Sequence, residues 1–272
     1  MEQLLAGQRA IVTGGSRGIG FEIARAMVEA GAEVLVCGRS RDALEAADRA
    51  LRAGYPEARL HSTVADVSSP TQVEALFRYA DEHMGALDIL VNNAGSGVFR
   101  PVAELSVEEW DTMIGTNLSG TFYCSREALQ RFLGPGRRSG PKWIVNISSL
   151  AAKNPFAGGA AYNASKFGLN GFSEALMLDH RHEEVRVTTS CRAAWTPASM
   201  ATKRGRSRPG RSRLKILQRS CWTSSGCRNA RLSAASKFVP RAHRKNSSRS
   251  ASWILGVPRD RCHQVKRRLR IN

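Results

Sequence analysis

The sequence contains no run of about 20 consecutive apolar residues, so it offers no candidate membrane-spanning helix. Its six cysteines show no paired spacing, and a chain of 272 residues can bury a core without disulfides. The opening residues, MEQLLAGQRAIVTGG, lack the pattern of a signal peptide. Together these absences predict a cytoplasmic globular protein with reduced thiols and no membrane partner.

Acidic residues are nearly missing from the last part of the chain. From Arg192 to Asn272 there are 22 Lys and Arg residues and one acid, Asp260, whereas residues 1–191 hold 19 basic and 22 acidic residues. The formal charge of +18 therefore comes from the tail alone. This composition predicts a tail that is disordered or poorly packed.

Two other interpretations of the tail are weaker. A basic arm could neutralise nucleic-acid phosphates, but its aromatic residues show no stacking-module pattern, so nucleic acid is not the partner we expect. Its cysteines and histidines lack C-x-x-C or H-x-x-x-H spacing, which disfavours zinc.

Residues 1–190 alternate between short β-branched apolar runs and segments with helical periodicity. Such alternation predicts an α/β fold: a doubly wound, parallel, Rossmann-type sheet of six strands with helices on both faces. The sequence thus divides into a domain over 1–190 and a tail over 191–272. The predicted strands are 9–14, 32–38, 58–66, 87–95, 142–149 and 185–190, and the predicted helices are 18–31, 41–54, 71–85, 107–133 and 160–182.

The usual dinucleotide pattern G-x-G-x-x-G is absent after the first strand. The turn TGGSRGIG instead spaces Gly14, Gly18 and Gly20 as G-x-x-x-G-x-G. Glycines there allow a tight turn and let a helix N-terminus present its free N–H groups to a pyrophosphate. A tight connection without any ligand is the alternative for this feature taken alone.

No carboxylate follows the second strand, where an NAD-selective site would bind the ribose hydroxyls. The segment CGRSR places Arg39 there, and Arg17 lies in the glycine turn. Guanidinium groups at both places favour the 2′-phosphate of NADP(H).

A possible catalytic group follows the fifth strand. Ser149 ends IVNISS, and Tyr162 and Lys166 are four residues apart, so on a helix they share one face. A phenol is a weak acid–base catalyst at neutral pH unless a nearby ammonium favours its ionised form. Without context, such a pair is usually only a helix-surface pair.

T-G-x-x-x-G-x-G, N-N-A-G at 92–95, and Ser149 followed by Y-x-x-x-K occur in this order over residues 6–190. The sequence therefore resembles a classical short-chain dehydrogenase/reductase, in particular the NADP(H)-dependent carbonyl reductases of that family. The resemblance implies an enzyme that moves a hydride between the nicotinamide and a ketone or secondary alcohol. It also implies a small-molecule substrate and a homo-oligomer formed through 107–133 and 160–182.

The resemblance also assigns roles to individual residues. Tyr162 would be the general acid, Lys166 would assist it and hold the nicotinamide ribose, Ser149 would bind the substrate oxygen, and Asn117 would anchor a water leading protons to the lysine. The cofactor would be bound by Thr13, Gly14, Ser16, Arg17, Gly18, Ile19 and Gly20 at the phosphates, Arg39 and Ser40 at the 2′-phosphate, Asp66 and Val67 at the adenine, and Asn93, Ala94, Gly95, Tyr162 and Lys166 at the nicotinamide side.

The chain departs from the family after the sixth strand. The family continues with Pro-Gly, a threonine that contacts the nicotinamide, a substrate helix and a seventh strand. This chain instead continues Cys191-Arg192-Ala193-Ala194-Trp195-Thr196-Pro197 and shows no convincing seventh strand downstream. One allowed coding of Cys191 to Pro197, read one base earlier, gives Pro-Gly-Ser-Val-Asp-Thr. We therefore hypothesise that residues from about 191 onward are translated out of frame. A catalytically weak nucleotide-binding protein with a nucleic-acid-binding tail is the alternative function.

Overall fold

The computed structural model describes the backbone of residues 3–192 and the side chains of residues 3–190. The predictions made for residues 193–272, including the missing seventh strand, the disordered tail and the shifted frame, lie outside these residues. So do the zinc and nucleic-acid alternatives.

Six parallel strands form one sheet in the order β3-β2-β1-β4-β5-β6. The predicted doubly wound fold is confirmed, because the strand order reverses direction between β1 and β4. All strands end at the same edge of the sheet, so the loops after β1, β2, β4 and β5 meet there. The strands are β1 (Arg9–Thr13), β2 (Glu33–Gly38), β3 (Leu60–Val64), β4 (Ile89–Asn92), β5 (Lys142–Ser149) and β6 (Val185–Arg192).

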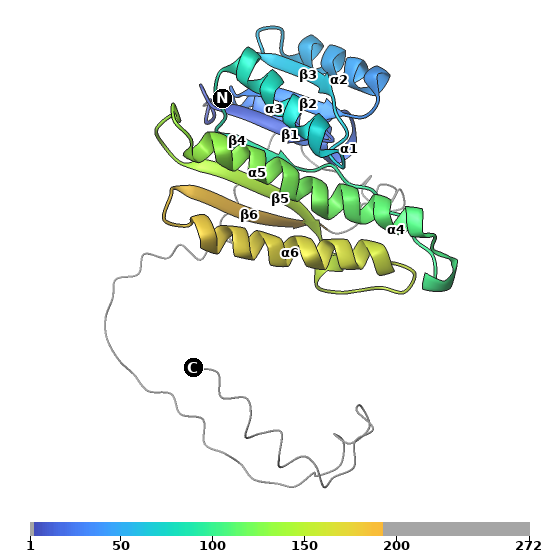
Figure 1. The fold of residues 1–272 in the computed structure, drawn as a ribbon. Helices are drawn as coiled ribbons and strands as arrows, with labels where there is room; N and C mark the ends of the chain where they lie inside the picture. The colour runs from blue at the N-terminus through green and yellow to red at the C-terminus, as the bar shows by residue number, and fades with distance from the viewer. Residues whose placement is uncertain (1–2, 193–272) are drawn as a thin grey trace, which may run out of the picture. The chain divides into compact units, whose positions relative to one another are not determined.

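Helices cover both faces of this sheet. Helices α3, α5 and α6 lie across the near face in Figure 1, while α1 and α2 pack against the opposite face. The helices are α1 (Gly18–Glu29), α2 (Arg41–Gly54), α3 (Pro70–Met84), α4 (Val107–Ile114), α5 (Gly120–Leu133) and α6 (Ala160–His180), with short helical turns at Val102–Glu104 and Leu150–Ala152.

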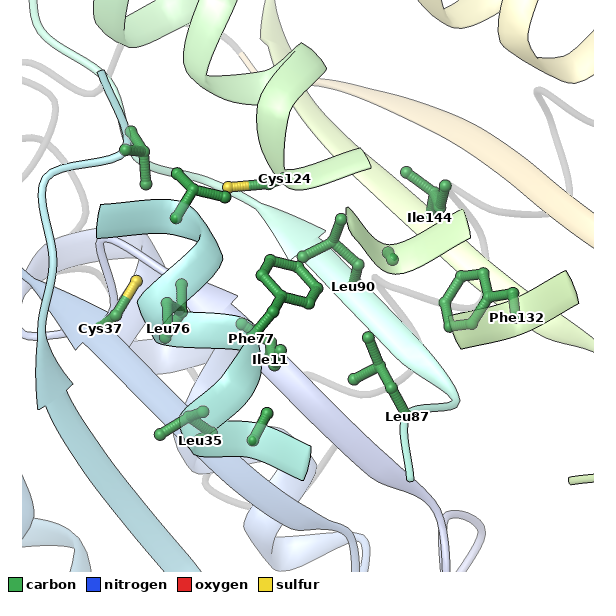
Figure 2. Packing of buried hydrophobic residues seen from close by; sticks show 14 of the residues in the cluster. Ile11, Leu35, Cys37, Leu76, Phe77, Leu87, Leu90, Cys124, Phe132 and Ile144 are labelled. Atoms are coloured by element: carbon green, nitrogen blue, oxygen red, sulfur yellow. The ribbon is translucent and has the colours of Figure 1, made fainter. Parts of the chain in front are cut away.

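Alternating strand side chains build a separate core on each face. Ile11, Leu35 and Leu90 point toward α3 and α5, where Phe77 and Phe132 are fully buried (Figure 2). The intervening residues of the same strands, such as Val12 and Val34, pack against α1 and α2. A strand buried on both faces is nearly all apolar, which explains the continuous β-branched runs in the sequence.

Local signals in the sequence explain where helices begin and end. Ser40 accepts a hydrogen bond from the backbone N–H of Ala43 and thereby caps α2. Ser106 and Glu109 form a reciprocal capping box at the start of α4. Helix α3 ends at Gly85, whose φ of 70° favours glycine.

The predicted helix over 107–133 is not uniform. Residues Gly115–Ser119 form a π-helical turn between α4 and α5, which the 3.6-residue periodicity did not reveal. Strand β6 continues to Arg192, two residues past the predicted domain boundary at 190. Within residues 3–192, none of the helices is both long and apolar enough to cross a membrane.

Candidate cofactor and catalytic site

The glycine turn after β1 packs directly against the loop after β4. A Cβ atom on Gly14, whose φ is 62°, would lie 2.8 Å from the Cα of Ala94. A Cβ atom on Gly20 would lie 2.3 Å from the carbonyl oxygen of Gly14. Both glycines are therefore required by close backbone approach, as the sequence predicts for a phosphate-binding turn.

Hydrogen bonds fix these two loops to each other. The hydroxyl of Thr13 accepts from the backbone N–H groups of Asn93 and Ala94 at 3.0 and 3.1 Å and donates to the carbonyl of Val91. The amide of Asn93 donates to the carbonyls of Thr13 and Gly14, both at 3.0 Å. Thr13 and Asn93 thus hold the turn rather than leaving their polar groups free.

The N-terminus of α1 fits a phosphate-bearing ligand. Among the described residues no side chain caps the helix, and its first turn contains no acidic residue, which suits an anion. Gly18, with φ of 59°, begins the helix, and Ile19 packs into the core beneath it. The cradle formed by Gly14 and Gly20 and this uncapped helix end suit the pyrophosphate of a dinucleotide.

The turn also contacts the end of β2. A Cβ atom on Gly38 would lie 3.3 Å from the hydroxyl of Ser16, so Ser16 lies over this strand end. Arg17 and Arg39 are exposed, and neither forms an ion pair within the part of the chain that the structure describes. Ser40 is engaged as the cap of α2, which leaves its hydroxyl proton free to donate.

The loop after β3, predicted to lie at the adenine side of the cofactor, is held by hydrogen bonds within its own turn. One carboxylate oxygen of Asp66 accepts from the backbone N–H and the hydroxyl of Ser68 at 2.9 and 2.7 Å. Val67 is buried against Gly120, where a Cβ atom would lie 2.8 Å from the Val67 side chain. These contacts anchor the loop after β3 on α5.

The proposed catalytic residues come from β5, α6 and the π-helical turn. Ser149 ends β5, and its Oγ accepts from the backbone N–H of Ala151 at 3.2 Å. The Nζ of Lys166 is buried, donates to the carbonyl of Ile147 at 2.9 Å and lies 5.9 Å from the centre of the Tyr162 ring. The structure thus confirms that Tyr162 and Lys166 share one face of α6.

Asn117 lies in the π-helical turn, and its side chain hydrogen-bonds to the loop after β4 and to α6. Its Oδ1 accepts from the backbone N–H of Ser96 at 2.8 Å, and its Nδ2 donates to the carbonyl of Ser96 and to the hydroxyl of Ser165. A Cβ atom on Gly95 would lie 3.2 Å from the Asn117 Oδ1 and 3.9 Å from the Lys166 Nζ. Gly95 therefore sits where Asn117 and Lys166 converge.

A buried polar network below the site was not predicted. The Nδ2 of Asn92 donates to Ser125 at 3.1 Å and to the Oδ1 of Asn146 at 2.9 Å, and Asn146 donates to Ser173 at 2.8 Å. The network joins β4 and β5 to α5 and α6. An asparagine inside the apolar strand KWIVNISS was the available signal, since buried amides are normally hydrogen-bonded.

This arrangement defines a class of protein: a Rossmann-fold domain whose strand edge brings a close-packed glycine turn to the same edge as a Ser, Tyr and Lys group. The model of the short chain dehydrogenase family matches residues 8–208. The chain belongs to the short-chain dehydrogenase/reductase family of oxidoreductases, which act on small molecules with a nicotinamide cofactor.

Particular relatives agree with this assignment. A short-chain type dehydrogenase/reductase of Picea abies is 38% identical over 205 residues, 73% of this chain and 72% of the relative. A 3-oxoacyl-[acyl-carrier-protein] reductase of Chlamydia muridarum is 35% identical over 187 residues, 69% and 73% of the two chains. The crystal structure of a metagenomic short-chain oxidoreductase in complex with NADP aligns with a TM-score of 0.63 and 38% identity, covering 71% and 84%.

Proposed function

We propose that this chain is an NADP(H)-dependent reductase of ketones, with the reverse oxidation of secondary alcohols, and that Tyr162 is its general acid and base. The observation that carries the proposal is the buried Lys166 ammonium beside the Tyr162 ring, at the strand edge that also holds the glycine cradle. When bound, the nicotinamide supplies the hydride.

The side chains of this site divide the remaining work. The Tyr162 hydroxyl donates a proton to the carbonyl oxygen, and the ammonium of Lys166 stabilises the resulting phenolate. The Ser149 hydroxyl hydrogen-bonds the same oxygen and stabilises the negative charge that develops there. Asn117 positions the site through Ser96 and Ser165 and does not itself react.

Preference for NADP(H) over NAD(H) is the second part of the proposal. Arg17 lies in the glycine turn and Arg39 directly follows β2, and neither residues 13–20 nor residues 38–41 include an acid that would bind ribose hydroxyls. We expect Arg39→Ala to weaken NADPH binding about 10-fold, the effect of losing one charge-assisted contact, and to leave NADH binding unchanged. Fluorescence titration with both cofactors measures this, and equal weakening of both would contradict the assignment.

The experiment that tests the activity follows NADPH oxidation with a panel of ketones. We expect Tyr162→Phe to lower kcat about 10²- to 10⁴-fold, because the general acid is lost, while NADPH still binds. Tyr123→Phe, which removes a hydroxyl from α5, is the matched control and should retain activity. No turnover by the unmodified chain with any ketone would contradict the proposed activity.

Self-association is the third part. Large apolar side chains are exposed on α4, α5 and α6, among them Trp110 (40%), Phe122 (46%) and Leu178 (54%). Exposed apolar surface of this kind commonly marks a protein interface, and a second copy of the chain is the occupant that the family resemblance implies. Sedimentation velocity should show an oligomer, and Phe122→Glu should shift it toward monomer.

A second candidate function follows from the charge of the tail, where 22 basic residues accompany one acid. Such a segment would hold nucleic acid through phosphate contacts that weaken steeply with salt. Retention on DNA at low salt that disappears when residues 192–272 are deleted would support this function. Retention that survives the deletion would exclude it.

A further inference from the structure

Two phenylalanine rings lie beside the proposed general acid, Tyr162. The ring of Phe99, in the loop after β4, meets the Tyr162 ring edge-on at 5.4 Å between centres and 80° between planes. Phe156, in the loop after β5, lies 5.5 Å from Phe99 and 6.5 Å from Tyr162. These separations and tilts are those that aromatic rings favour in contact.

The two phenylalanines are held in place and are not loose surface residues. A Cβ atom on Gly159 would lie 2.5 to 3.0 Å from three atoms of the Phe156 ring, so this ring rests on glycine backbone. A Cβ atom on Gly97 would lie 3.0 Å from the Phe99 ring and 3.5 Å from the Tyr162 ring. The amide of Asn163 also donates to the backbone carbonyl of Phe156 at 3.0 Å.

Both rings nevertheless present much of their surface outward. Phe99 is 58% exposed and Phe156 is 45% exposed. Val102 and Leu150, in the same two segments, are 70% and 44% exposed. Exposed apolar groups beside a few convergent polar groups are typical of a ligand site.

The two segments carry few charged residues. Residues 96–103 and 150–159 contain no acid and two cations, Arg100 and Lys153. Arg100 is already paired with Glu109 at 2.9 Å. The wall beside Tyr162 is therefore apolar and aromatic.

We propose that Phe99 and Phe156 form a specificity wall that selects apolar ketones bearing a ring. The substrate ring packs against the two phenyl rings, and the continuity of Phe99 with the Tyr162 ring directs the carbonyl toward the Tyr162 hydroxyl. This inference rests on the proposed role of Tyr162. It makes Phe99 and Phe156 specificity residues, and acyclic substrates gain little from them.

The test uses the full chain and two probes, 1-tetralone as a fused-ring ketone and the acetoacetyl thioester of N-acetylcysteamine as an acyclic one. We expect Phe99→Ala and Phe156→Ala each to lower kcat/KM for 1-tetralone about 10- to 100-fold and to change the value for the thioester less than about 3-fold. Val64→Ala, an exposed apolar truncation on β3, is the control and should change neither value. An equal loss of kcat/KM for both probes, or no loss for 1-tetralone, would contradict the proposed specificity role of Phe99 and Phe156.

A binding measurement separates this inference from the proposed activity. The dissociation constant of 1-tetralone is measured by saturation-transfer NMR in the Tyr162→Phe background, with and without Phe99→Ala. A weakening of about 10-fold on loss of Phe99 supports the wall even if the unmodified chain reduces no ketone. Absence of 1-tetralone binding to both the unmodified chain and Tyr162→Phe contradicts the proposal, because the two rings then provide no binding site for this ketone.

Discussion

At the scale of single residues, the cradle depends on two positions, Gly14 and Gly20, that have no room for a side chain. Gly14 and Gly20 bring the backbone of the first turn against Ala94 and Asn93, and any side chain at these positions would collide with backbone or with the Asn93 amide. Close backbone approach of this kind is what a phosphate-binding turn requires.

Replacing Gly20 tests the cradle directly. In Gly20→Ala the new methyl would lie 2.4 Å from the Asn93 amide nitrogen as well as 2.3 Å from the Gly14 carbonyl. We expect a loss of about 1–3 kcal/mol in the free energy of unfolding from overpacking, and loss of NADPH binding. Denaturant unfolding and fluorescence titration measure the two effects.

Gly54→Ala is the matched control, since a Cβ atom there would meet no atom within 4 Å. It should be neutral or stabilise the protein by up to about 1 kcal/mol. A Gly20→Ala variant that resembles this control in both measurements would contradict the account of the cradle.

Cys37 provides a pH dependence at the residue scale. Its thiol is buried against the α3 side of the sheet, near Cys124 in the same cluster, and burial raises its pKa from 9.0 to about 12 (Figure 2). An unfolded thiol ionises near pH 9, whereas the folded one stays protonated. Its contribution to stability is therefore complete below about pH 9 and is lost as pH rises toward 12, at about 1.4 kcal/mol per pH unit.

Urea unfolding at several pH values between roughly 8 and 10.5 measures how steeply the free energy of unfolding falls with pH. Cys37→Ala removes the titrating group, so its unfolding free energy should fall less steeply with pH than that of the unmodified chain. Identical slopes would contradict the assignment. Iodoacetamide should also leave Cys37 unmodified until the protein is denatured.

At the scale of elements, one carboxylate joins three strands at the edge opposite the proposed cofactor site. Asp88, just before β4, accepts from the Lys142 ammonium on β5 at 2.7 Å and from the backbone N–H of Arg9 on β1 at 3.0 Å. Arg138 adds a second cation at 3.0 Å. Asp88 and Lys142 are both about 2% exposed, so each is buried and needs its partner.

Asp88→Asn should therefore be strongly destabilising. It leaves the Lys142 ammonium buried without an opposite charge, and we expect a loss of about 3–5 kcal/mol in the free energy of unfolding. Urea unfolding followed by tryptophan fluorescence measures it. Glu45→Gln, which breaks an exposed pair with Arg49, is the control and should change stability by less than about 0.5 kcal/mol. A loss below about 1 kcal/mol in Asp88→Asn would contradict this assignment.

At the scale of the whole molecule, the composition of the chain changes directly after β6. On the face carrying α1 and α2, β5 presents Trp143 and Val145, while the described helix at β6, α6, contacts it from the other face. Both side chains pack against the core cluster on that face, and the Arg186 guanidinium lies 5.0 Å from the centre of the Trp143 ring. The two domains proposed from sequence differ by composition at this same point.

The shifted-frame hypothesis predicts what the gene encodes there. In the frame one base earlier, Trp195-Thr196 gives aspartate and Cys221-Trp222-Thr223 gives Leu-Asp, whichever codons are used. Acids thus appear where the present tail has almost none. Resequencing the DNA across codons 185–200 should find one additional base, and the restored chain should unfold at a higher temperature than the present one.

An intact frame, confirmed by the mass of the purified protein, would contradict this hypothesis and make the basic tail a native part of the molecule. A restored frame whose product unfolds at no higher temperature than the present chain would contradict the expected gain in stability. Activity toward ketones, measured on both chains, shows whether the segment contributes to the substrate site.

The sequence by itself determined the strand and helix order, the glycine turn and the spacing of Tyr162 and Lys166, because periodicity, glycine and helical spacing act over a few residues. It did not reveal the π-helical turn that carries Asn117. It also did not reveal the Asn92 and Asn146 network, because these partners lie far apart along the chain. Nor did it place Phe99 and Phe156 against Tyr162. Only tertiary packing decided these contacts, because loops after β4 and β5 meet solely when their strands lie side by side in one sheet.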